Sequence, residues 1–109
     1  MLGQSFSVEV RPAREQLVIE VSGEVDLATA PQIHEIVADA VGDGWNQLIV
    51  DLRAVSFMDS AGVHLLLKLQ ALREDGVNCQ MIDGRPEIHR VLGFCGLGDV
   101  LGRADPANL

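Results

Sequence analysis

Residues 47–52, with the sequence Gln-Leu-Ile-Val-Asp-Leu, form a nearly continuous apolar run of strand length. A strand with one face in water usually alternates apolar and polar residues, whereas an almost unbroken apolar run is typical of a strand covered on both faces. Such a strand lies inside a sheet that helices flank. This segment therefore predicts a central strand of an α/β domain.

The rest of the chain supplies neighbours for that strand. Alternating segments at 6–10 and 17–21 predict a β-hairpin, and the apolar residues of 77–82 predict a further strand. Helical spacing predicts a first helix that follows a capping pattern at Thr29 and ends near Gly42.

Two more helices are expected, one from Ser60 to a left-handed stop at Gly76 and a short one through Ile88 and Leu92. The order β-β-α-β-α-β-α predicts an α/β fold. Its mixed sheet should have four to five strands, mostly parallel with an N-terminal antiparallel hairpin, and should pack with three to four helices.

Length and charge restrict the function classes. The 109 residues suit a single domain spanning 1–109, in which residues 103–109 are expected to form a loosely ordered tail. A formal charge of -8 without a basic cluster argues against direct binding of nucleic acid. Apolar runs stay shorter than the roughly 18 residues of a membrane span, and the N-terminus does not resemble a signal peptide, so a cytoplasmic protein is expected.

Cysteine and histidine patterns do not indicate a metal or redox site. Cys79 and Cys95 lack CxxC spacing and have apolar neighbours, which favours buried, reduced thiols over a redox pair. His34, His64 and His89 are scattered, one in each predicted helix, without the spacing of a zinc site. We therefore expect neither a metal nor a cofactor.

The segment Met58-Asp59-Ser60-Ala61-Gly62 places a hydroxyl where an irregular loop is expected to become a helix. Ser60 is predicted to be the N-cap, a position where backbone N–H groups and the helix dipole receive negative charge. The Gly23-Glu24-Val25-Asp26 turn follows another strand and should lie at the same sheet edge. Ala61 and Gly62 are small enough to let a partner approach the helix closely.

Three interpretations of Ser60 are open. It caps the helix and nothing more; it is a nucleophile with Asp59 and His64 nearby; or it is modified by another protein. The nucleophile interpretation is weak, because Met58 replaces the first glycine of a GxSxG elbow and His64 lies on the same helix as the serine. No phosphate-binding glycine loop is present either, so the chain is not expected to be an enzyme.

The segments Gly23–Asp26 and Asp51–Gly62 together resemble the paired signature of STAS domains, in particular the bacterial anti-sigma factor antagonists. The resemblance covers nearly the whole chain, with Ala61 where Ser or Thr is also common and Val63 where Leu often stands. It implies a partner-switching protein. The unphosphorylated form would bind an anti-sigma factor that is a serine kinase and so release a sigma factor, phosphorylation of Ser60 would end that binding, and a serine phosphatase would reset it.

Other roles remain open within this family. The domain could be a module of a lipid-transport ATPase or of a stress-sensing scaffold, and serine hydrolysis at Ser60 is a remote alternative. A monomer or weak dimer is expected. The sequence identifies neither the sigma factor nor the stimulus.

The charge of a phosphate accounts for the implied switch. Phosphorylation adds about -1.5 to -2 charge at the start of a helix, where the dipole compensates roughly 0.3–1 kcal/mol. Folding should therefore survive while an interface is disrupted. Asp26 and Asp59 are the candidate charged neighbours. Asp26 is predicted either to hydrogen-bond the Ser60 hydroxyl, to position it for the kinase, or to be a solvated turn residue. Asp59 could equally be a partner of the dipole at the N-terminus of the helix.

Overall fold

A computed structural model describes residues 6–94 and 101–109 of the chain. Its centre is a five-stranded sheet with the strand order β1-β2-β3-β4-β5, in which β1 pairs antiparallel with β2 and every other pair is parallel. The predicted mixed sheet, its antiparallel edge and the central place of residues 47–52 are confirmed. The strands are β1 (Ser7–Ala13), β2 (Gln16–Val25), β3 (Gln47–Met58), β4 (Asn78–Ile82) and β5 (Gly102–Arg103).

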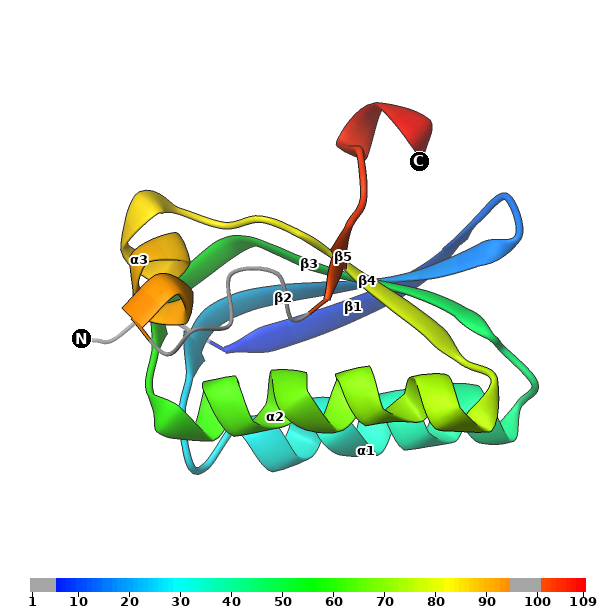
Figure 1. The fold of residues 1–109 in the computed structure, drawn as a ribbon, viewed down its shortest axis with the longest axis horizontal. Helices are drawn as coiled ribbons and strands as arrows, with labels where there is room; N and C mark the ends of the chain where they lie inside the picture. Colours follow the sequence, from blue (N-terminus) through cyan, green and yellow to red (C-terminus); the bar gives the residue numbers. More distant parts are fainter. Residues whose placement is uncertain (1–5, 95–100) are drawn as a thin grey trace.

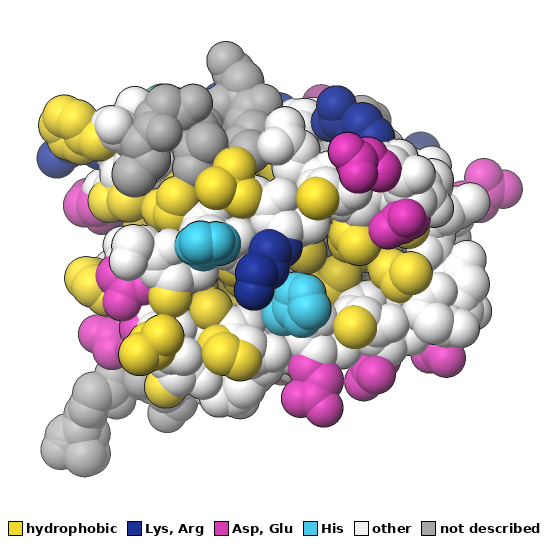
Figure 2. All heavy atoms as spheres, turned by 60° about the horizontal axis from the view of Figure 1, so that its bottom comes forward, with side chains coloured by type: hydrophobic (Ala, Val, Ile, Leu, Met, Phe, Trp, Pro, Cys, Tyr) yellow, Lys and Arg dark blue, Asp and Glu magenta, His cyan; other side chains and the backbone are white. Residues whose placement is uncertain are grey.

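Helices cover one face of this sheet (Figure 1). α1 and α2 run side by side beneath the strands, α3 lies beside the end of β3, and the C-terminal segment crosses the opposite face. Figure 2 looks onto the outer surface of the layer formed by α1 and α2. The helices are α1 (Ala30–Gly42), α2 (Ser60–Ala71) and α3 (Pro86–Phe94), with short 3-10 turns η1 (Leu72–Asp75) and η2 (Pro106–Asn108).

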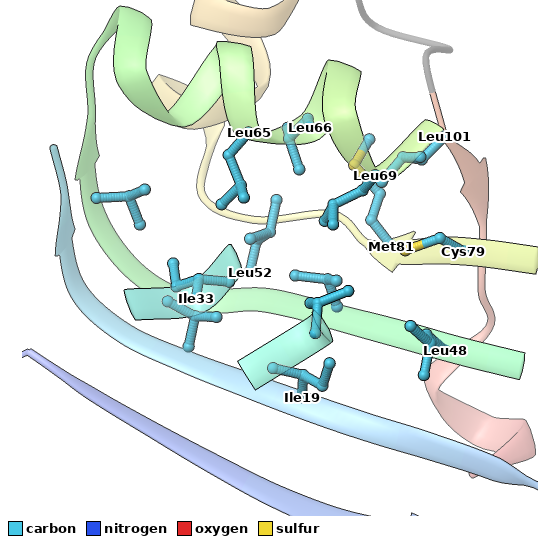
Figure 3. Packing of buried hydrophobic residues seen from close by; sticks show 14 of the residues in the cluster. Ile19, Ile33, Leu48, Leu52, Leu65, Leu66, Leu69, Cys79, Met81 and Leu101 are labelled. Carbon is cyan, nitrogen blue, oxygen red and sulfur yellow. The ribbon is translucent and has the colours of Figure 1, made fainter. Parts of the chain in front are cut away.

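The main core lies between the sheet and the two long helices. Apolar residues of β2, β3 and β4 point toward Ile33 of α1 and toward the leucines of α2 (Figure 3). Leu66 and Leu69 are almost completely buried there. Gly76 ends η1 with φ of 81°, the left-handed conformation predicted for it, although the last turn before it is 3-10 and not α-helical.

The opposite face of β3 has a different cover. Val18, Ile49 and Ile82 form a second small cluster, and Leu109 and Ala104 pack against it. The prediction that helices cover both faces of the sheet was therefore wrong, because the C-terminal segment of the chain covers the second face. In the segment expected to form a tail, Arg103 pairs with Met81, Pro106–Asn108 form a 3-10 turn, and Leu109 packs on the second cluster.

A buried carboxylate shares that opposite face. Asp51 is only 5% exposed and receives two hydrogen bonds from the Arg53 guanidinium, at 3.0 Å to Oδ1 and 2.8 Å to Oδ2. Burial alone would raise the pKa of Asp51, but the hydrogen bonds and charge of Arg53 outweigh it and hold the pKa below its ordinary value. The polar residue that interrupts the apolar run of β3 is thus paired.

The thiol of Cys79 is buried, and this burial raises its pKa to about 12. It stays protonated at neutral pH and is a poor nucleophile, as its apolar surroundings predicted. Cys95 lies outside the described residues. Within the described ranges, the helices are all too short or too polar to cross a bilayer.

Candidate functional site

The strands β2 and β3 end together at one edge of the sheet. Val25 pairs with Met58, and the Asp59 backbone N–H donates to the Val25 carbonyl at 3.2 Å. The residues that follow, Asp26 in one loop and Ser60 in the next element, therefore start from adjacent points. The two sequence segments singled out as a signature do meet at this edge.

Asp59, and not Ser60, is the N-cap of α2. Its backbone is extended, and its carboxylate accepts a hydrogen bond from the Ala61 N–H at 2.8 Å. Its carbonyl accepts from the Gly62 and Val63 N–H groups at 3.1 and 3.2 Å. The prediction of Ser60 as the cap was wrong by one residue. β3 also continues to Met58, so only Asp59 separates strand from helix and the expected irregular loop is absent.

Ser60 is consequently the first residue of α2, and its side chain is exposed. Its hydroxyl forms no hydrogen bond with any described part of the chain, because the cap interactions belong to Asp59. A serine freed from the capping role can be reached from solvent. A phosphate added there would follow the Asp59 carboxylate in the chain, at a helix start where the N–H groups of Ala61, Gly62 and Val63 already have acceptors.

Asp26 organises its own loop. Its carboxylate accepts from the backbone N–H groups of Ala28 and Thr29, at 2.9 and 3.0 Å, and its Oδ1 lies 3.1 Å from the Thr29 hydroxyl oxygen. The backbone N–H of Thr29 is the main reason that the pKa of Asp26 lies below its ordinary value. The predicted hydrogen bond from Asp26 to Ser60 is not formed among the described residues. Thr29 is the N-cap residue of α1, as predicted, but its side chain makes no capping hydrogen bond, because its hydroxyl donates to the Glu24 carbonyl at 2.7 Å.

The two small residues after Ser60 have different surroundings. A Cβ on Gly62 would lie 2.4 Å from Met58 Cγ and 3.0 Å from Val25 Cγ1, so this glycine is needed for packing inside the molecule. Gly62 is buried and not available to a partner. Ala61 is half-buried and lines a groove between α1 and α2, where the small side chain leaves space.

Gly23 and Glu24 lie in the irregular part of β2. Gly23 has φ of 93°, a conformation that strains other L-residues, and the pairing of β2 with β3 shifts immediately after it. Glu24 is exposed and pairs with Phe57. Both residues shape the edge on which Asp26 and Ser60 lie.

Two exposed apolar side chains at this edge were not predicted as site residues. Leu27 is 80% exposed in the loop after β2, and Phe57 is 47% exposed near the end of β3. The register shifts between β2 and β3 restart the inward and outward alternation, which leaves Phe57 outside while Val55 and Met58 are buried. The alternation of residues in the sequence alone does not predict that Phe57 is exposed. The presence of a phenylalanine three residues before Ser60 was the available indication of apolar surface at this edge.

Among the described residues, Ser60, Asp59 and His64 do not form the hydrogen-bonded arrangement of a nucleophile and its base. His64 lies one helical turn beyond Ser60 without a hydrogen bond to it, and the Asp59 carboxylate is used by the cap. Residues 6–94 and 101–109 contain no group of three or more side chains placed to hold a metal ion. The edge offers instead an accessible hydroxyl, fixed carboxylates and exposed apolar surface.

The sequence of residues 6–107 matches the STAS domain family. The chain belongs to this family. Among curated proteins, this STAS domain is 31% identical over 98 residues to an anti-sigma-B factor antagonist of Staphylococcus aureus, which covers 89% of this chain and 91% of the relative.

Solved structures give the same picture. The STAS domain is 30% identical to the anti-sigma factor antagonist SpoIIAA in its unphosphorylated form, with a TM-score of 0.74 over 94% of this chain and 90% of that one. The phosphorylated form of Bacillus SpoIIAA matches with a TM-score of 0.68, also at 30% identity, and covers 94% of each chain. This chain therefore shares its fold with a protein solved in both an unphosphorylated and a phosphorylated form.

Proposed function

We propose that this STAS domain is an anti-sigma factor antagonist. Its unphosphorylated form binds an anti-sigma factor with serine kinase activity and so releases a sigma factor, and phosphorylation of Ser60 ends the binding. A serine phosphatase restores the active form. ATP and any metal ion belong to those partners and not to this chain, which acts as substrate and binding protein in the cytoplasm.

One observation carries this proposal, namely the exposed Ser60 hydroxyl without a hydrogen-bond partner in the described structure. The neighbouring Leu27 and Phe57 supply apolar contact area for a protein partner, which a docking kinase needs. The similarity to antagonists named for their action on anti-sigma factors supports this function over that of a transporter module or hydrolase.

Electrostatics explains why a phosphate would release the partner. Two unit charges about 4 Å apart interact by roughly 4 kcal/mol at an effective dielectric of about 20, so a phosphate with nearly two charges would be repelled by any carboxylate that the partner places against Ser60. An interface closed over an exposed hydroxyl would also have to desolvate that charge. A loss of a few kcal/mol corresponds to roughly a hundredfold or more in affinity.

The test is phosphorylation of the purified protein by a candidate anti-sigma kinase from the same organism, with the site mapped by mass spectrometry. Kinase binding is then compared for wild type, Ser60→Ala and Ser60→Asp, with Ser7→Asp on the exposed strand β1 as a matched charge control. We expect phosphate on Ser60, and we expect Ser60→Asp to weaken binding about a hundredfold while Ser7→Asp leaves it unchanged. Phosphate on another residue, or equal binding by the two Asp variants, would refute the proposal.

A further inference from the structure

A groove runs along the outer surface between α1 and α2. Its first part, of about 340 Å³, begins at Leu27 and Ala61, next to Ser60. Its second part, of about 230 Å³, continues toward Val41 and Leu72. His34 and Lys68 line both parts, so the two hollows are adjacent and these two side chains stand where they meet.

The groove has an apolar floor and one charged side chain, that of Lys68, at its centre. Alanine, valine and leucine side chains from both helices form most of its walls, and His34, His64 and Lys68 stand among them. Figure 2 shows two histidines and a basic side chain in the middle of this face, with acidic side chains toward its periphery. Neither part of the groove is lined by an Asp or Glu.

This local charge is opposite to that of the molecule. The chain has sixteen acidic residues against eight Lys and Arg, and Lys68 is its only lysine. Lys68 is exposed and makes no ion pair with the described residues. The Lys68 ammonium and the histidine N–H groups therefore leave hydrogen-bond donors free for an acceptor that comes from outside.

The shape of the groove favours a helix as its occupant. It lies between two helices, whose backbone N–H and C=O groups are already paired, so an extended peptide would find no strand edge to join. From Ala61 to Leu72 it follows α2 for roughly 17 Å, at a rise of about 1.5 Å per residue, which matches about three turns of a docked helix. A helix of that length can place several apolar side chains on the floor.

We propose that the α1–α2 groove binds an amphipathic helix of a protein partner, with leucine-like residues on the face that docks and carboxylates beside it that meet Lys68, His34 and His64. The carboxylates accept charge-assisted hydrogen bonds from the Lys68 ammonium. This inference does not depend on phosphorylation of Ser60 and goes beyond the switch at that residue.

The test uses two labelled synthetic peptides of about four helical turns, each with leucines along one face. One carries glutamates on both flanks, and its twin carries lysines at the same positions. Binding to the unphosphorylated protein is measured by fluorescence anisotropy, and the contact surface is mapped by amide chemical shifts. We expect the acidic peptide to bind at least about tenfold more tightly than its twin and to shift resonances of α1 and α2. General attraction to a chain of charge -8 would give the reverse preference.

Variants locate the interaction. Lys68→Glu should weaken binding of the acidic peptide at least about tenfold, and Lys68→Met, which keeps an apolar stem, should weaken it less. Arg73→Glu, an exposed charge reversal in η1 outside the groove, is the matched control and should have little effect. The inference fails if the acidic peptide does not bind, if the lysine twin binds more tightly, or if Lys68→Glu and Arg73→Glu have equal effects. Ser60→Ala should bind the acidic peptide like wild type, so this result is separate from the outcome of the kinase test.

Discussion

At the scale of single residues, Asp59 and Ser60 divide two roles that the sequence could assign to either. Asp and Ser are both favoured N-cap residues, so adjacent positions give a local pattern that fits both assignments. The structure gives the cap to Asp59 through its contact with the Ala61 N–H. Ser60 then contributes little to helix stability, which leaves it open to modification without loss of the fold.

This division predicts that substitutions at the two neighbouring positions change the stability of the protein by different amounts. Asp59→Ala should lower the free energy of unfolding by about 1 kcal/mol, because it removes the cap, whereas Ser60→Ala should change it by less than about 0.5 kcal/mol. Urea unfolding of both variants, followed by circular dichroism, measures the difference. Asp59→Asn keeps a capping oxygen and should recover most of the loss. A larger loss of stability in Ser60→Ala than in Asp59→Ala would show that Ser60, and not Asp59, is the N-cap.

At the scale of elements, β3 and α2 are held together where Gly62 packs against Met58 and Val25. The first turn of the helix lies so close to the ends of β2 and β3 that a methyl group has no space. This contact fixes the position of Ser60 relative to the sheet. Gly62 therefore serves the site indirectly, through packing and not through contact with a partner.

A pair of glycine substitutions tests this contact. Gly62→Ala should destabilise the protein by about 1–3 kcal/mol through overpacking, although alanine is the better helix former. Gly93→Ala in α3, where an added Cβ meets no atom within 4 Å, should be neutral or stabilise by up to about 1 kcal/mol. Thermal and urea unfolding of the two variants gives the comparison. Equal effects would mean that Met58 moves aside without cost.

The sequence allowed the order and type of the elements to be predicted, because apolar periodicity records which face of each element is buried. It was less informative about how far β3 extends and about Phe57. Both depend on the register shifts with β2, which are a property of two strands together and leave no periodic pattern in either one. The groove between α1 and α2 was missed for a similar reason, since His34 and Lys68 meet only when the helices pack.

At the scale of the whole molecule, the two faces of the sheet have different kinds of cover. α1 and α2 bury one face, while the short C-terminal segment covers Val18, Ile49 and Ile82 on the other. A chain ending at Arg103 should expose this second cluster. Its free energy of unfolding should fall by about 2 kcal/mol, the typical contribution of burying one or two large apolar side chains.

Urea unfolding of this shortened chain, with Ala107→Ser in the full chain as a control at an exposed position of the segment, measures the effect. Leu109→Ser should reproduce part of the loss. Unchanged stability in the shortened chain would show that residues 104–109 do not contribute to the core.

The two borders of the sheet have a consequence for assembly. On β1, the outermost strand at one side, exposed Glu9 and Arg11 alternate with apolar residues and Pro12 lacks an N–H to donate, while at the other side β5 is only two residues long. Charged side chains, proline and short length all hinder the addition of a further strand from another chain. These features disfavour growth of the sheet at both borders, so we expect other proteins to contact the helices and the loops where β2 and β3 end.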